Sequence, residues 1–441
     1  MYDVRKRSAS RRSGGVLRTR LAEDRGRLRR IGQPTRAKER DGIRTDARIR
    51  ILVLTGYYLP GYKAGGPIRS ISGMIESLGD DFEFRVLTTD RDLGDTEPYP
   101  GIARGTWIPQ GKAQVMYLSP QFLRLGPLAR IIRETPYDMV YLGGCFDPTL
   151  VLPALLLRRL GLVKMPALML APQGVFSPGA LGIKALKKKA FLALARTTRL
   201  YGGLTWHVST IFEKHDVHRV LRLQCRSHFV VVAPDIHSIS DDPPPLPRRK
   251  SSTRLQVVFL SRVCPKKNLD GAIRILQGIE VPVDFHIYGP AEDQAYWHLC
   301  EDAMRELPPN VSATYRGPIA HSEVAAVMRS HDLFFLPTHG ENFGHVIIEA
   351  LREGCPALIG DTTAFRHLEA RGAGWDLPPE DVEGFRRILQ KCAAMTHEQW
   401  LPWSQGARRL AVAISAEKET ADRYRTAFQE IVARQRVARA A

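Results

Sequence analysis

The sequence has few of the features that mark membrane-spanning, disulfide-bonded or zinc-binding proteins. No apolar run approaches the roughly 18 residues needed to cross a bilayer. The longest candidate, TLVLPALLLRRLGL, is interrupted by Pro153, Arg158 and Arg159. The six cysteines are scattered at intervals of at least about thirty residues, without a CxxC pair. This spacing argues against a zinc site or a disulfide framework, and we expect a cytoplasmic protein with reduced thiols.

Two motifs of other enzyme classes are also missing. The loop after the first predicted strand reads GYYLPGYKAGG, without the GxGxxG fingerprint of a Rossmann dehydrogenase. No DxD-type acidic pair stands at a predicted strand end in the second half, and Asp241 and Asp242 fall in a proline-rich segment instead. We therefore expect neither a metal ion nor another cofactor.

Positive charge is abundant but unevenly placed. The 441 residues carry a net charge of +18, and residues 1–50 hold 17 Lys/Arg against 6 Asp/Glu, or +11, which leaves +7 for the rest. The arm at 1–46 is predicted to be disordered. It either binds anionic lipid or nucleic acid, or is an over-extended translation start without a role. Since no aromatic and basic platform follows it, a nucleic-acid-binding protein is the less favoured alternative.

Strands and helices alternate in two separate blocks. The first block, 47–237, and the second, 254–403, are joined by SISDDPPPLPRRKSST, a proline-rich linker at 238–253. Residues 404–441 are predicted to be helical and to pack back on the first block. The sequence therefore predicts two doubly wound, Rossmann-like α/β domains facing across a cleft, with ligands beyond the carboxyl ends of the strands.

Charged residues and a glycine follow two predicted strands of the second domain. Arg262 and Lys267 bracket the loop LSRVCPKKNLDG, where two fixed cations suit a diphosphate or triphosphate. The alternative is a pair of solvated loop charges. Tyr288 and Gly289 end the next strand, and the glycine either lets a ligand approach the backbone or simply makes a turn.

The stretch THGENFGHVIIEAL contains two carboxylates around a predicted helix start. A helix that begins near Phe343 or Gly344 offers free amide groups to an anion. Glu349 would lie roughly 7.5 Å further along the helix, near a nucleotide ribose, whose two hydroxyls a carboxylate can accept. Glu341 would lie on the sugar side of the phosphates. The alternative is that Glu341 complements the helix dipole and Glu349 is solvated.

These motifs together resemble the donor-binding domain of GT-B glycosyltransferases of family 4, over residues 254–378. The resemblance is carried by R-x4-K, by YGP, by E-x7-E with its inner NFG, and by Gly374–Trp375. It implies that Arg262 and Lys267 hold the donor diphosphate, that Glu341 contacts the sugar, and that Glu349 binds the ribose. Phe343, Gly344, Asn342, Tyr288 and Gly289 are the further donor-binding candidates.

The first domain resembles the acceptor domain of the same family less strongly. GYYLPGYKAGGPIRSIS fits its glycine-rich loop, so Gly65 and Gly66 are expected to approach the acceptor or the donor phosphate. Where many relatives have a His-Asp pair, this chain has APQG. Gln173 can bond a sugar hydroxyl but cannot shuttle a proton at neutral pH.

The segment Gly182–Leu200 places lysines beside apolar residues at the start of a predicted helix. It either lies on an anionic membrane, giving peripheral contact with the inner face, or is an ordinary surface helix.

The predicted function is retaining transfer of a sugar from a nucleotide-diphospho-sugar, with UDP as the expected carrier, to a saccharide or lipid-linked acceptor. The expected context is polysaccharide or lipopolysaccharide biosynthesis. The enzyme alternative is a nucleotide-sugar hydrolase or epimerase of the same fold.

Overall fold

A computed structural model describes residues 48–182, 185–221, 230–236, 250, 253–291, 293–415 and 418–440. Arg48–Ala441 forms one compact unit. The basic arm and most of the predicted linker lie outside the described residues, so both remain predictions.

The described part of the first half contains a sheet with the strand order β3-β4-β2-β1-β5-β6-β7-β8. Its strands are parallel except β3, which pairs antiparallel with β4. The strands are β1 (Arg50–Thr55), β2 (Glu83–Thr89), β3 (Trp107–Gln110), β4 (Ala113–Leu118), β5 (Met139–Gly143), β6 (Leu168–Ala171), β7 (Thr205–Val208) and β8 (Val230–Val232). The helical segments are α1 (Gly66–Leu78), η1 (Pro120–Leu123), α2 (Leu125–Glu134), α3 (Val151–Arg159), α4 (Pro178–Gly182), α5 (Ala185–Thr197) and α6 (Ile211–Leu221).

Both faces of this sheet are covered, which explains the continuous apolar run of β1. Ile51 and Val53 pack on one side, where α1 supplies Ile71. Leu52 and Leu54 point to the other side, where α2, α3, α5 and α6 contribute buried residues. Successive side chains of a strand alternate between the two faces of the sheet. A strand buried on both faces is therefore expected to be apolar at nearly every position.

The second half forms a parallel sheet with the order β11-β10-β9-β12-β13-β14. If these six strands are numbered along the chain from β9, the order across the sheet is 3-2-1-4-5-6. This is the strand order of a doubly wound nucleotide-binding fold. The strands are β9 (Leu255–Leu260), β10 (Val283–Tyr288), β11 (Val311–Gly317), β12 (Leu333–Leu336), β13 (Ala357–Gly360) and β14 (Gly374–Leu377). The helical segments are η3 (Pro265–Lys267), α7 (Leu269–Gln277), α8 (Gln294–Arg305), α9 (His321–Arg329), α10 (His345–Arg352) and α11 (Val382–Ala394), followed by α12 (His397–Ser415) and α13 (Lys418–Ala440).

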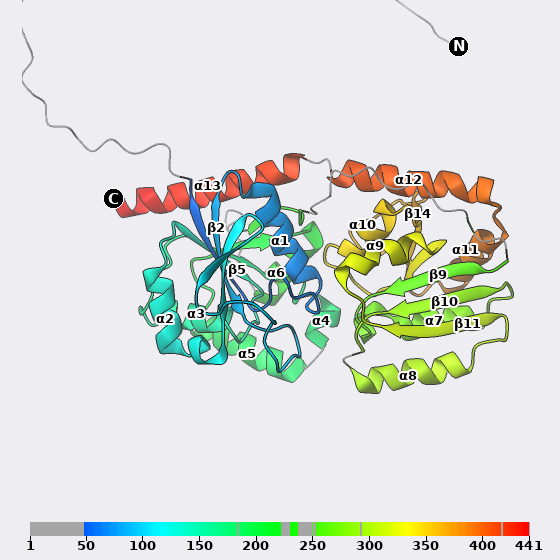
Figure 1. Cartoon of the computed structure of the whole chain (residues 1–441), viewed down its shortest axis with the longest axis horizontal. Coiled ribbons are helices and arrows are strands. Elements are labelled where there is room, and N and C mark those ends of the chain that lie inside the picture. The colour runs from blue at the N-terminus through cyan, green and yellow to red at the C-terminus, as the bar shows by residue number, and fades with distance from the viewer. Residues whose placement is uncertain are drawn as a thin grey trace, which may run out of the picture. The chain divides into compact units, whose positions relative to one another are not determined.

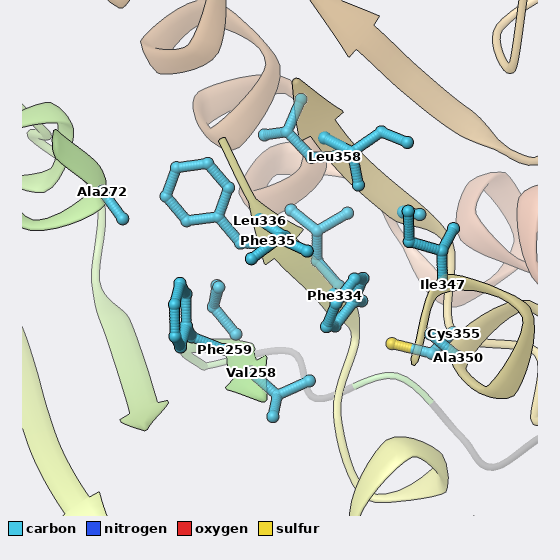
Figure 2. Close-up of a cluster of buried hydrophobic side chains, with 14 of the residues drawn as sticks. Val258, Phe259, Ala272, Phe334, Phe335, Leu336, Ile347, Ala350, Cys355 and Leu358 are labelled. Carbon is cyan, nitrogen blue, oxygen red and sulfur yellow. The ribbon is translucent and has the colours of Figure 1, made fainter. Parts of the chain in front are cut away.

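The core of this half is built around β12. Figure 2 shows Phe334 and Phe335 among the side chains of β9, α10 and β13. Phe335 lies 6.3 Å from Phe285 and 5.8 Å from Phe385, ring centre to ring centre. Every residue of β12 is buried. This packing fixes the position at which the chain leaves β12 and turns into α10.

The two last helices belong to different halves. Helix α12 packs against α10, and α13 packs against α1 and β5 of the first half (Figure 1). Phe428 of α13 meets Phe82 with ring centres 5.4 Å apart. The predicted boundary at 404 falls inside α12, because the helical segment begins earlier, at His397. Across the residues described, no helix is both long and apolar enough to cross a membrane.

Candidate functional site

A cavity of about 380 Å³ lies where strand ends of both halves meet. Its second-half wall includes the ends of β9 and β10 and the start of α10. The order of the second sheet reverses between β9 and β12, and such a switch point is where open α/β sheets bind ligands. Ten of the predicted site residues line the cavity: Gly65, Gly66, Gln173, Arg262, Lys267, Gly289, Glu341, Asn342, Phe343 and Gly344.

Lys267 and Glu341 form an ion pair at the floor of this cavity. Their side chains are only 10% and 14% exposed. Burial would raise the pKa of Glu341, but the charges of Lys267 and Lys266 outweigh it and hold that pKa below its ordinary value. Glu341 is therefore an anion whose charge is already matched by lysine before any ligand binds.

The turn before α10 requires a glycine. Gly344 caps the helix with φ of 89°, in the left-handed region. An added Cβ would lie 2.9 Å from Ile347 and 3.0 Å from Phe365. Phe343 is 7% exposed and belongs to the core, so it forms part of the cavity wall. The residues at the start of α10 line the cavity, and a helix start is where an anion site would lie.

Glu349 is buried rather than solvated, with 7% of its surface exposed. Its Oε1 is bound by Nη1 of Arg69, which reaches across from α1. Its Oε2 is buried without a hydrogen-bond partner in the described structure. Glu349 does not itself line the cavity, whereas its neighbours Arg69 and His321 do. One carboxylate oxygen is therefore left for a further donor.

Tyr288 and Gly289, at the end of β10, lie in different surroundings. Tyr288 is absent from the cavity wall and packs against the core, with its ring 6.4 Å from that of His331. Gly289 has φ of 129°, and an added Cβ would lie 1.9 Å from the carbonyl oxygen of Ser261. The glycine is thus required by the neighbouring strand end, and its backbone also lines the cavity.

The glycine-rich loop of the first half reaches the second half directly. A Cβ on Gly66 would lie 3.7 Å from Cδ2 of His345. Gly65 caps α1 with φ of 67°. The loop is held by Asp92, whose Oδ2 accepts the backbone N–H groups of Tyr62 (2.7 Å) and Lys63 (3.0 Å). This clamp positions the start of α1 at the cavity.

Gln173 lines the cavity from the first half, just beyond the end of β6. Its backbone adopts a left-handed φ of 57°, and its Nε2 is buried without a partner among the described residues. The next residue, Gly174, approaches so closely that an added Cβ would lie 2.9 Å from Cβ of Asn342. Glu213 accepts the N–H groups of Gly174 and Ser209, and burial raises its pKa to about 7. The unpartnered amide is free to bond a ligand oxygen.

A buried polar cluster joins the halves and was missed in the sequence. Asp235, just beyond β8, accepts hydrogen bonds from Ser70 (2.6 Å) and Ser209 (3.0 Å). His345 at the start of α10 lies 3.4 Å from the same carboxylate and 3.0 Å from Ser70. Burial would raise the pKa of Asp235, but His345 and Ser70 bring it below its ordinary value. Only its position directly after a strand could have singled out Asp235.

Charge in the cavity is strongly positive. Its wall holds five Lys/Arg side chains and two Asp/Glu side chains, a balance of +3 with histidine neutral. The lysines and arginines are Lys63, Arg69, Arg262, Lys266 and Lys267. Such a wall attracts a ligand with several negative charges.

Comparison with known proteins assigns the second half. Residues 247–399 match the family described as glycosyl transferases group 1. This stretch of the second half therefore resembles a group 1 glycosyltransferase domain. A 93-residue stretch is 34% identical to phosphatidyl-myo-inositol mannosyltransferase from Mycolicibacterium smegmatis. That match covers 20% of this chain and 24% of the relative.

Solved structures extend the likeness to the fold of both halves. Sucrose-phosphate synthase from Thermosynechococcus elongatus has a TM-score of 0.64 at 15% identity and covers 88% of this chain and 100% of its own. HepE from Anabaena, solved with UDP and glucose, has a TM-score of 0.62 at 16% identity and covers 87% and 100%. The predicted GT-B architecture is confirmed. The residues that match the group 1 family thus form the second of the two α/β halves of this fold.

Proposed function

We propose that the protein is a retaining glycosyltransferase that uses a nucleotide-diphospho-sugar, with UDP as the expected carrier, and a saccharide or lipid-linked acceptor. The observation that carries this proposal is the positive cavity between the two halves, whose second-half wall lies in the residues that match the group 1 family. Diphosphate binding needs fixed cations and is favoured at a helix start, and both the cations and the start of α10 line this cavity. The polysaccharide or lipopolysaccharide context belongs to the same proposal.

The proposed chemistry needs positioning and charge stabilisation more than a protein nucleophile. The bond between the anomeric carbon and the diphosphate oxygen breaks, and its electron pair stays on the diphosphate. The acceptor oxygen bonds to the same face of the anomeric carbon, and its proton passes to the departing diphosphate. Arg262, Lys267 and the α10 amide groups would stabilise the growing charge, and Glu341 would contact the sugar.

Glu349 provides the first test. Substituting Glu349→Gln is expected to weaken nucleoside diphosphate binding about tenfold or more, since a charged acceptor for the ribose hydroxyls is lost. Thermal shift and calorimetry with UDP, GDP and ADP, each beside its 2′,3′-dideoxy analogue, measure this. Wild type should prefer ribose, and the variant should bind both forms alike.

The same assays decide between functions. A wild type stabilised by no nucleoside diphosphate would refute the proposal. Equal ribose preference in the Glu349 variant would remove the ribose role alone. Turnover of a nucleotide sugar without an acceptor would favour the hydrolase or epimerase, and an EDTA arm tests the proposed independence from metal ions.

We further propose that the first half contacts an anionic membrane through α5 and the start of α6. Leu186 and Leu194 of α5 are 83% and 61% exposed, and Ile211 and Phe212 of α6 are 50% and 58% exposed. Exposed Lys187 and Lys189 flank the leucines of α5. The two helices are joined by a bond from Arg196 to the carbonyl of Val220 (2.9 Å). Apolar side chains beside lysines fit a surface of anionic headgroups.

Vesicle flotation tests this surface. The double variant Leu186→Ser/Leu194→Ser is expected to lose about tenfold or more of its binding to vesicles containing phosphatidylglycerol, since each buried leucine contributes roughly 1.5–3 kcal/mol. Leu299→Ser is a matched control, because Leu299 is 60% exposed but lies on α8 of the other half. Equal binding by all three proteins would refute a membrane role for α5.

A further inference from the structure

Two cations of the cavity have no anionic partner among the residues that the structure describes. Arg262 is exposed at the end of β9, and Lys266 is half-buried in η3. Neither side chain forms an ion pair or hydrogen bond with a described residue. The other three cations are all paired: Lys267 with Glu341, Arg69 with Glu349 and Lys63 with Asp95. The charge left for a ligand is therefore that of Arg262 and Lys266.

The backbone of Lys266 is fixed to the loop that leads into α10. Its carbonyl accepts hydrogen bonds from Oγ1 of Thr338 (2.9 Å) and from the backbone N–H of His339 (3.0 Å). Its Cε lies 3.4 Å from the position that a Cβ on Gly340 would occupy. The stem of the lysine therefore runs along the 338–340 loop, and its end belongs to the cavity wall. A lysine held in this way loses little further freedom when it binds an anion.

The electrostatic surroundings of Lys266 favour an incoming anion. Burial lowers its pKa, Glu341 works against that change, and the charges of Lys267 and Arg262 lower the pKa further. The cationic form of Lys266 is thus destabilised mainly by burial and further by the two neighbouring cations. A diphosphate placed among these three side chains would relieve their mutual repulsion.

We propose that Lys266, together with Arg262, binds the diphosphate of the donor. The two cations would offset the negative charge that the diphosphate gains when its bond to the sugar breaks. The inference rests on the proposed function and adds a residue to it. A sugar-linked diphosphate carries about two negative charges, and the released nucleoside diphosphate gains about one more near neutral pH. Lys267 is ion-paired with Glu341, whereas Lys266 forms no ion pair with a described residue, so Lys266 is the lysine with more charge available to a ligand.

Calorimetric titration of the full chain tests the assignment with Lys266→Gln and Lys266→Arg. The ligands are inorganic pyrophosphate and UDP, GDP and ADP with their monophosphates. Lys266→Gln is expected to weaken diphosphate and pyrophosphate binding about 10- to 100-fold and monophosphate binding less. Lys266→Arg keeps the charge and is expected to stay within a few-fold of wild type. Lys112→Gln is the control, because Lys112 is paired with Asp80 away from the cavity.

The ratio of diphosphate to monophosphate affinity, taken within each variant, separates charge recognition from damage to the fold. A ratio that is unchanged in Lys266→Gln overturns the inference, as does an equal loss in the glutamine and arginine variants. Either result leaves the proposed function standing if wild type and the control still bind. Failure of wild type itself to bind any diphosphate would instead refute the proposed function.

Discussion

The variant Lys267→Met is expected to lose at least about a hundredfold in kcat/KM, corresponding to roughly 3 kcal/mol of transition-state stabilisation. The same change should lower the free energy of unfolding by about 3–5 kcal/mol, because Glu341 would remain buried as an unpaired charge. Few single substitutions combine losses of this size. Transfer kinetics and urea denaturation measure the two quantities separately.

Arg262 offers a matched comparison. It is exposed and has no ion-pair partner among the described residues, so Arg262→Gln should reduce transfer to a similar degree while changing stability by only about 0.5 kcal/mol. The double variant Lys267→Met/Glu341→Gln should recover much of the stability but none of the transfer. A Lys267→Met protein with wild-type stability would show that the buried pair contributes nothing. Normal transfer by that variant would remove Lys267 from the site.

The variant Gly289→Ala is expected to destabilise the protein by about 3 kcal/mol or more, and to reduce transfer even at temperatures where it is folded. Its Cβ would overlap the carbonyl of Ser261 at 1.9 Å, in a backbone conformation that alanine rarely adopts. Relief of that overlap requires β9 and β10 to separate at their ends. Arg262, the next residue after Ser261, would move with the strand end.

The variant Gly65→Ala serves as a comparison for Gly289→Ala, because it introduces backbone strain without overlap of the added Cβ with a neighbouring atom. Gly65 also has a positive φ of 67°, but no atom lies within 4 Å of its added Cβ. This variant should cost only the backbone strain, about 1–3 kcal/mol. Urea denaturation of both variants gives the comparison. Equal losses would mean that backbone strain, and not contact with Ser261, explains the glycine at 289.

Much of the fold could be predicted because strands buried on both faces produce short continuous apolar runs. RILVLT and LFFL are of this kind, and both are fully or almost fully buried strands. The reason for individual glycines could not be predicted in the same way. Gly374 meets the backbone of Ala357, with an added Cβ 1.9 Å from its carbonyl oxygen. The Gly-Trp motif therefore reflects strand packing that only the paired sheet reveals.

Site residues that share one loop could be predicted from the sequence. Site residues that come together only from distant parts of the chain could not. Arg262 and Lys267 stand close in the sequence and meet at the cavity. Asp235 lies 110 positions before His345, the difference of their numbers, and their 3.4 Å approach depends on both halves being folded. Lys266 was overlooked for the opposite reason. Beside Lys267 in the sequence it looks redundant, and only the pairing of Lys267 with Glu341 distinguishes the two lysines.

Helix α13 also affects the order in which the chain can fold during synthesis. Tyr424 and Phe428 complete the core of the first half, and the ring of Tyr424 lies 4.9 Å from that of His207. These residues leave the ribosome after the whole second half. The first half must therefore wait with an exposed apolar face while its neighbour folds. We expect chaperones to bind and protect this apolar face until α13 has been synthesised. We also expect that cutting the chain at the predicted linker would not give two independently folded fragments.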